Sequence, residues 1–342
     1  MDIAIYRDIL KLFEGTPKRD VGVRVRSRAG DGEERTSNGR IVVSHASYGP
    51  NRSPHRGPGM ATSETPPGVR PLIAPMRWLL YAASALVFLA GFQLTVFSEQ
   101  TATYFAWTIM RPLTAAFLGA SYWAAVPVEI IAARQSTWAS ARVAVPAIWL
   151  FTTLTLVTTL LHFDLFHFSP SAVLSAQAAA WFWLAIYAGV PVAMLLIWIL
   201  QVRAPGTDPP RGPPAPMWMR FLVLGQGVGM LAVGVALFLA PDAVKGGWPW
   251  GLTTLTARAT GAWLIGIGFA AFHASRENDF LRIRPLAGGY IAFAILQLIA
   301  IVRYAGDVNW NGPAAWVYVA FLASVLPVGL FGWFGHRTIG AR

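Results

Sequence analysis

The chain has 342 residues, of which 55% are hydrophobic and only 13% are charged. Soluble globular domains carry about a quarter charged residues, so this composition excludes an ordinary soluble protein and indicates one that lies in a lipid bilayer. Although the net charge is +11, the basic residues beyond residue 75 lie mostly in short segments between apolar runs, which is typical of membrane topology rather than of nucleic-acid binding. The chain has no cysteine, which excludes disulfides, thiolate metal ligands and a cysteine nucleophile.

Residues 1–75 differ from the rest of the chain. Apart from a possible amphipathic helix at the start, they are charged, rich in Gly, Ser and Pro, and poor in apolar side chains. Such a segment buries too little surface to offset the entropy of ordering, so we expect a disordered cytoplasmic tail. Met60 opens a short lead-in to the first apolar run, which makes it an alternative start of translation.

Eight apolar stretches follow the tail, each about as long as a helix that crosses a hydrocarbon core of about 30 Å. They lie at roughly 78–97, 111–131, 143–162, 178–200, 220–240, 257–274, 285–303 and 315–335. The sequence therefore predicts an all-α integral membrane protein with eight transmembrane helices.

A proline-rich linker at 203–218 divides the eight stretches into two sets of four, at 76–202 and 219–342. Its composition predicts a stiff cytoplasmic spacer. The two sets resemble each other in order. MRWLLYAASALVFLAG, which starts at residue 76, is matched by MRFLVLGQGVGMLAVG from residue 219, and TAAFLGASYWAA from residue 114 by TGAWLIGIGFAA from residue 260. We interpret this as a duplication that gives two parallel four-helix repeats, related by an axis along the membrane normal.

The basic residues predict the orientation, because cytoplasmic loops are enriched in Lys and Arg. Beyond residue 75, eleven arginines fall on one side and four basic residues on the other. The eleven are Arg77, Arg134, Arg142, Arg203, Arg211, Arg220, Arg276, Arg282, Arg284, Arg337 and Arg342, and the four are Arg111, Lys245, Arg258 and Arg303. Both termini are thus expected in the cytoplasm. The preference for Arg over Lys, with much Ala, Gly and Pro, favours a bacterial inner membrane.

Polar residues near the outer end of the third stretch form the first candidate site. Thr152, Thr155, Thr159 and His162 share one helical face, which could be a solvated path or could pack against a neighbouring helix with each hydroxyl bonded to its own helix. We expect His162, close to the carboxylate of Asp164, to titrate near neutral pH and to act as a gate.

The same segment, LHFDLFHF, offers a second hypothesis. His162, Asp164 and His167 could bind zinc or iron, but their spacing matches no helical metal motif. The interleaved phenylalanines are also typical of a membrane interface without chemistry.

Three further charged residues at membrane depth are candidates, because burying charge there is costly. Arg111 and Arg258 open the second and sixth stretches and could bind an anion between the repeats, or extend their guanidinium groups to the lipid headgroups. Glu129 could pair with Arg134, reach interfacial water, or carry a proton.

The glycine-rich segment GQGVG at 225–229 follows no strand and is therefore no phosphate loop. We interpret Gly225 and Gly229, four residues apart, as a close-packing face. No nucleotide motif or catalytic triad is present, so no cofactor is implied, and the expected partners are the bilayer and a possible homo-oligomer or membrane complex.

Three functions remain open from the sequence. A small-solute or ion transporter or permease is favoured, since internal repeats with polar residues near a shared axis are a common transporter plan. The alternatives are an integral membrane enzyme or metal-binding protein that uses the His/Asp cluster, and a non-catalytic subunit of a membrane complex.

Overall fold

The computed structural model divides the chain into two units, Met1–Gly59 and Met60–Arg342, and describes residues 68–339. Most of the predicted tail, the alternative start at Met60 and the terminal Arg342 lie outside the described residues. The prediction of disorder is wrong for the last residues of the tail. The Arg70 amide donates to the Thr207 carbonyl at 2.9 Å, and the Leu72 amide donates to the Ser136 carbonyl at 3.0 Å.

The described part of the chain is helical and contains eight helices that are long and apolar enough to cross a membrane. This confirms the prediction of a polytopic helical membrane protein. The long helices are α2 (Ala74–Val96), α4 (Pro112–Ala133), α6 (Ala144–Leu161), α7 (Leu174–Arg203), α8 (Met217–Leu239), α10 (Thr254–Glu277), α11 (Phe280–Arg303) and α12 (Pro313–Ile339).

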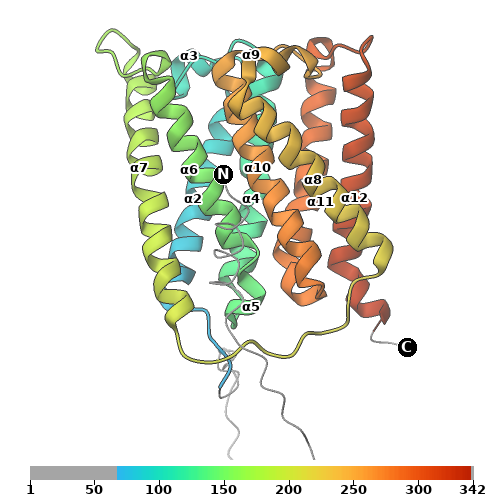
Figure 1. The fold of residues 1–342 in the computed structure, drawn as a ribbon. Coiled ribbons are helices and arrows are strands. Elements are labelled where there is room, and N and C mark those ends of the chain that lie inside the picture. The colour runs from blue at the N-terminus through green and yellow to red at the C-terminus, as the bar shows by residue number, and fades with distance from the viewer. Residues whose placement is uncertain (1–67, 340–342) are drawn as a thin grey trace, which may run out of the picture. The chain divides into compact units, whose positions relative to one another are not determined.

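Short helical turns join the long helices at both ends of the bundle. They are α3 (Thr101–Tyr104), α5 (Trp138–Ala141), α9 (Pro241–Val244) and the 3₁₀ turns η1 (Phe163–Leu165), η2 (Lys245–Gly247) and η3 (Ala305–Asp307). Figure 1 shows α3 and α9 at one end of the bundle and the linker that joins α7 to α8 crossing the opposite end.

Side-chain caps begin the two helices that carry most of the buried charge. Thr253 and Thr256 form a capping box at the start of α10. The Asp279 carboxylate accepts from the amides of Leu281 at 2.8 Å and Arg282 at 3.3 Å, and so caps α11. Both caps satisfy amides that have no partner within the helix.

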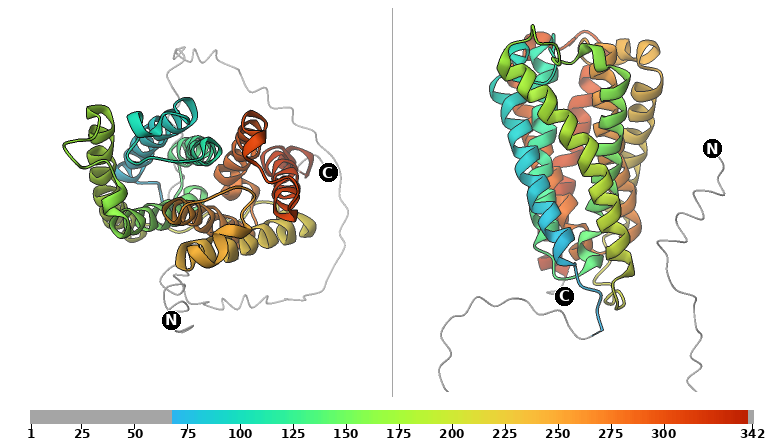
Figure 2. Two further views of the ribbon diagram at one scale, coloured as in Figure 1. Left: turned by 90° about the horizontal axis from the view of Figure 1, so that it is seen from above. Right: turned by 90° about the vertical axis from the view of Figure 1, so that its left-hand side faces the viewer.

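Four helices form the inside of the bundle. The buried share of the apolar segment is 78% in α10, 61% in α4, 56% in α11 and 50% in α6, but only 28% in both α2 and α7. Helix α4 packs on α11 and α10 packs on α6, while α2 lies along α4 and α8 along α10. The view from above in Figure 2 shows the outer helices around these inner ones.

Glycines bring the backbones of α8 and α10 into direct contact at two crossing points. A Cβ atom on Gly227 would lie 3.0 Å from the Gly268 carbonyl oxygen, and one on Gly234 would lie 3.0 Å from the Gly261 carbonyl oxygen. A side chain at any of these positions would therefore separate the helices.

The close-packing face predicted at Gly225 and Gly229 is wrong. A Cβ atom on either glycine would meet nothing within 4 Å, and both residues lie on the exposed side of α8. The spacing of four was correct for a helical face, but the sequence did not reveal that Gly227 and Gly234 lie on the packed face.

The proline-rich linker is bonded to the helix ends rather than free of them. The Gly212 amide donates to the Asp279 carboxylate at 2.7 Å, and the Ala215 amide donates to the Asn278 side chain at 3.1 Å. The proline content predicted a stiff spacer. The amides of Gly212 and Ala215, however, donate to acceptors at the turn between α10 and α11.

Candidate functional site

The threonine face of α6 is buried, but its hydroxyls are occupied within the helix. Thr152, Thr155 and Thr159 each donate at 2.9 Å to the carbonyl four residues earlier. The Thr159 hydroxyl also accepts from the Trp183 indole N–H on α7 at 3.0 Å. This is the packing arrangement that the sequence left open as the alternative to a solvated path.

His162 ends α6 and contacts Arg258 of α10, with 2.6 Å between its Nε2 atom and the guanidinium. Since a guanidinium only donates, Nε2 is the acceptor. Burial, and then the charge of Arg258, lower the pKa of His162, while Asp164 acts weakly in the opposite direction. Asp164 thus favours the charged imidazole, as expected, but burial and Arg258 outweigh it, so the pKa of His162 is lowered overall.

Arg111 lies apart from this pair. It forms the N-cap of α4 and is 3.6 Å from the Asp307 carboxylate, with 58% of its side chain exposed. Arg258 instead lies within α10 and donates to the Phe238 carbonyl at 3.2 Å. The two arginines thus have different partners among the described residues.

The three proposed metal ligands are not brought together. His167 has both ring nitrogens engaged, with Nδ1 2.9 Å from the Phe105 carbonyl and Nε2 3.0 Å from the Thr108 hydroxyl. Among residues 68–335, no group of three or more His, Asp or Glu side chains could hold a metal ion. His162 and His167 instead form hydrogen bonds to residues of other helices and loops.

The structure contains a cavity of about 140 Å³ that the sequence did not predict. Side chains from α2, α4, α6, α7, α10 and α11 line it, and most of them are apolar. Aromatic rings form one wall, where Phe151 and Trp263 have centroids 3.9 Å apart and Trp183 and Tyr187 have centroids 4.4 Å apart. Of the predicted path residues, only Thr152 lines this cavity.

Few polar groups face this cavity. The hydroxyls of Tyr122 and Tyr187 are 2.5 Å apart and form a hydrogen bond across the cavity lining. Glu129 is 1% exposed, and its Oε2 atom has no hydrogen-bond partner. The Tyr290 hydroxyl, also in the lining, is buried without a partner. The expected ion pair between Glu129 and Arg134 is not formed among the described residues.

Sequence reasoning singled out Glu129 as an acidic residue in an apolar stretch, but it missed the tyrosines. Tyr122 comes from α4, Tyr187 from α7 and Tyr290 from α11. Because hydropathy does not fix the rotation of a helix, no pattern within one segment could show that they share a cavity. A tyrosine in the middle of an apolar span was the only available signal.

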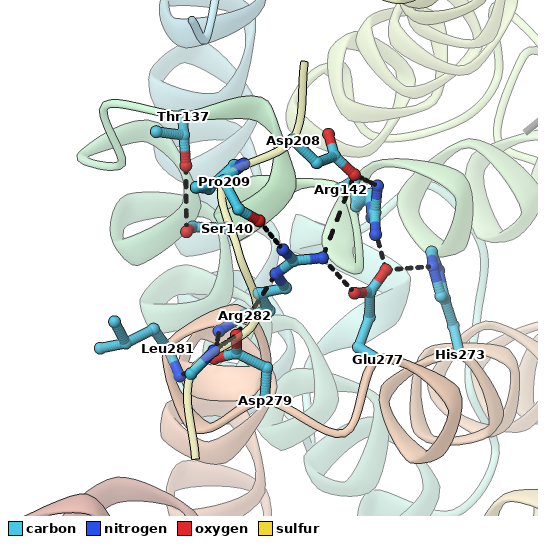
Figure 3. Close-up of polar contacts among 11 residues, drawn as sticks. Thr137, Ser140, Arg142, Asp208, Pro209, His273, Glu277, Asp279, Leu281 and Arg282 are labelled. Atoms are coloured by element: carbon cyan, nitrogen blue, oxygen red, sulfur yellow. Dashed lines mark hydrogen bonds and ion pairs between the residues drawn. The ribbon is translucent and has the colours of Figure 1, made fainter. Parts of the chain in front are cut away.

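A second polar cluster lies where the linker crosses the bundle (Figure 3). Arg142 binds the carboxylates of both Glu277 and Asp208. Arg282 is 3.1 Å from Glu277 and 3.4 Å from Asp279, and it donates to the Pro209 carbonyl at 2.6 Å. Glu277 and Arg282 are each 4% exposed, so this charge network is buried.

Comparison with known proteins found no match to the chain among family models, curated proteins or solved structures. The arrangement of the site is thus the only guide to function.

Proposed function

We propose that the protein is a small-solute transporter or permease, and that its solute site is the cavity between α2, α4, α6, α7, α10 and α11. The cavity itself is the observation that carries the proposal. Helix bundles in membranes pack closely, and ligand sites are typically apolar hollows with a few placed polar groups. Here Glu129, which has an unpartnered carboxyl oxygen, and Tyr290, which has an unpartnered hydroxyl, are among the residues that line such a hollow. Buried polar groups of this kind are expensive and usually functional.

We further propose that the eight helices are two parallel four-helix repeats. Contacts between the inner helices support this. A Cβ atom on Gly289 would lie 3.4 Å from the Ala124 carbonyl oxygen, and one on Gly266 would lie 3.5 Å from the Ala147 carbonyl oxygen. Adding 142 to 124 and to 147 gives 266 and 289, so exchanging the halves converts one contact into the other.

The ends of α6 and α11 obey the same offset. His162 and Tyr304 cap these helices with similar backbone angles, and a 3₁₀ turn follows each. By this offset the counterpart of Arg111 is Thr253, since both are N-caps. The pairing of Arg111 with Arg258 rested on each of them opening an apolar stretch. We replace it with the pairing that the offset of 142 gives.

The cavity lies where the proposed repeats meet, because its walls come from helices on both sides of the linker. Transporters built from repeats commonly bind solute at the repeat interface and expose it to either side when one repeat rocks against the other. The arginine-rich end that the linker crosses is proposed to face the cytoplasm of a bacterial inner membrane.

Cysteine accessibility tests the proposal, and the chain's lack of native cysteine makes the experiment clean. Ile186 lines the cavity, whereas its neighbour Ala185 is exposed on the outer surface of α7 at the same depth. In vesicles, Ile186→Cys should react with a membrane-impermeant methanethiosulfonate reagent, and the matched control Ala185→Cys should not.

Equal and negligible labelling of both variants from either side of the membrane would contradict a transport role. A hollow that water never reaches cannot pass a solute between compartments, and a subunit of a membrane complex would need no such access.

A further inference from the structure

The charge of the cavity lining narrows the class of solute. Glu129 is the one ionisable acid among the lining residues, and no Lys, Arg or His side chain lines the cavity. A carboxylate without a counter-ion at membrane depth is costly, so it either holds a proton or meets a cation supplied from outside. Because the lining residues supply no cation, any cation that pairs with the Glu129 carboxylate has to belong to a ligand.

The aromatic residues that line the cavity together with Glu129 suit a cation with an apolar body. Tyr122 and Trp263 pack edge to face with centroids 4.8 Å apart, and Trp183 lies on the same wall. Aromatic faces attract ammonium groups, and the attraction strengthens where water is excluded. The Tyr290 hydroxyl adds a second unpartnered polar group to the lining.

Two lining side chains also lie on the outside of the bundle. Leu89 of α2 is 44% exposed and Phe182 of α7 is 50% exposed. Both helices have largely unburied surfaces, so the cavity reaches the lipid-facing surface between α2 and α7. A molecule dissolved in the bilayer could enter there without crossing the polar ends of the bundle.

From these three observations we propose that Glu129 binds the ammonium group of a small lipophilic amine, with the aromatic wall around its apolar body. This inference rests on the proposed function, since it assigns a solute class to the same cavity. In the empty site Glu129 carries a proton. Binding of a permanent cation releases that proton to water, and an ion pair between the carboxylate and the ammonium replaces the O–H group.

A pair of isosteric probes separates charge from shape. Benzyltrimethylammonium carries a permanent positive charge, and neopentylbenzene has the same outline without charge. Binding to the purified full-length chain in nanodiscs is measured by the change in tryptophan fluorescence, with calorimetry as a check. Because binding of the cation displaces the proton, raising the pH should increase the affinity of the wild type for the cation. The increase should be up to about tenfold per pH unit in the range where the empty site is protonated.

The decisive variant is Glu129→Gln, which preserves the shape and removes the charge. It should weaken binding of the cation by at least about tenfold at pH 8 and abolish the pH dependence, while binding of the neutral probe stays within about twofold. Glu99→Gln is the matched control, because Glu99 lies outside the cavity lining. Retained binding of the neutral probe also shows that the variant is folded.

A cavity-filling variant distinguishes the two proposals. Ala125 lines the cavity one helical turn from Glu129, so Ala125→Phe should weaken binding of both probes, whereas the lipid-facing Ala185→Phe should not. If both probes depend on Ala125 but the cation binds equally to wild type and Glu129→Gln, the amine inference is overturned and the cavity remains a solute site. If neither probe responds to Ala125→Phe, the assignment of the cavity as solute site fails as well.

Discussion

Replacing Glu277 by glutamine should destabilise the bundle more than any single change of a surface charge. Glu277 binds Arg142, which precedes α6, and Arg282, which lies in the first turn of α11. Glutamine keeps the size of the side chain but cannot neutralise two guanidinium groups. The variant thus leaves two buried or half-buried cations with fewer partners.

The expected cost follows from the partners that remain. Removing one member of a buried ion pair typically costs about 3–5 kcal/mol, because the other charge stays buried. Here Arg142 retains Asp208, and Arg282 retains Asp279 and the Pro209 carbonyl. We therefore expect a loss near the lower limit, about 3 kcal/mol of unfolding free energy.

The measurement is equilibrium unfolding in mixed micelles of increasing SDS content, followed by tryptophan fluorescence. Asp242→Asn is the matched control, since it makes the same chemical change in an exposed pair with Lys245 and should leave the unfolding midpoint unchanged. Adding Arg142→Met to Glu277→Gln should cost about 1–3 kcal/mol less than the sum of the two single changes, because the groups are in contact. A loss for Glu277→Gln no larger than that of the control would show that water screens the network.

Three further outcomes are expected. Gly227→Val should cost about 1–3 kcal/mol by forcing α8 from α10, whereas Gly225→Val, which meets open space, should leave the same SDS-unfolding midpoint unchanged. Because the folded pKa of His162 is lowered, its contribution to stability is present above the unfolded pKa of about 6.5 and is lost as the pH falls toward the folded value. Wild type should therefore lose more unfolding free energy between pH 7 and pH 5 than His162→Gln, and an equal loss would refute this. Finally, Ser171→Cys and Pro213→Cys should react with an impermeant thiol reagent from opposite sides of the membrane, and reaction from one side would contradict the eight-span topology.

The number and approximate extent of the spans could be predicted from the sequence, because a bilayer demands long apolar helices whatever their packing. The stretch predicted at 178–200 is part of Leu174–Arg203, and that at 257–274 is part of Thr254–Glu277. The ends differ by a few residues since caps such as Thr253 and termini such as Arg203 are polar and depress hydropathy.

The site could be predicted only in fragments, because it depends on helix rotation and on pairs distant in the sequence. The face of Thr152, Thr155 and Thr159 was identified correctly as one side of a helix, but back-bonding to the preceding turn satisfies all three hydroxyls. Arg258 was recognised as a polar residue near the outer surface, yet its partner His162 is 96 residues away. The pattern of apolar and polar residues within either segment could not predict that these two side chains would meet.

The buried charge network would control access to the cavity from the linker end of the bundle, because it joins the two sets of helices there. Arg142 belongs to the first set of helices and Glu277 to the second, with Asp208 of the linker bound to the same guanidinium. If one proposed repeat rocks against the other, access from this end requires these ion pairs to separate, and their free energy opposes that state.

Weakening the network should therefore raise the population of the state that is open at the linker end. We expect Glu277→Gln to increase the rate at which Ile186→Cys reacts with an impermeant reagent applied from the linker side. A destabilisation of about 3 kcal/mol that fell wholly on the closed state would raise this rate by about a hundredfold. Labelling from the opposite side should not increase, because the ion pairs at that end, such as Arg111 with Asp307, are untouched. Equal acceleration from both sides would mean that the variant loosens the whole bundle, and the network would then be a structural clamp unrelated to access.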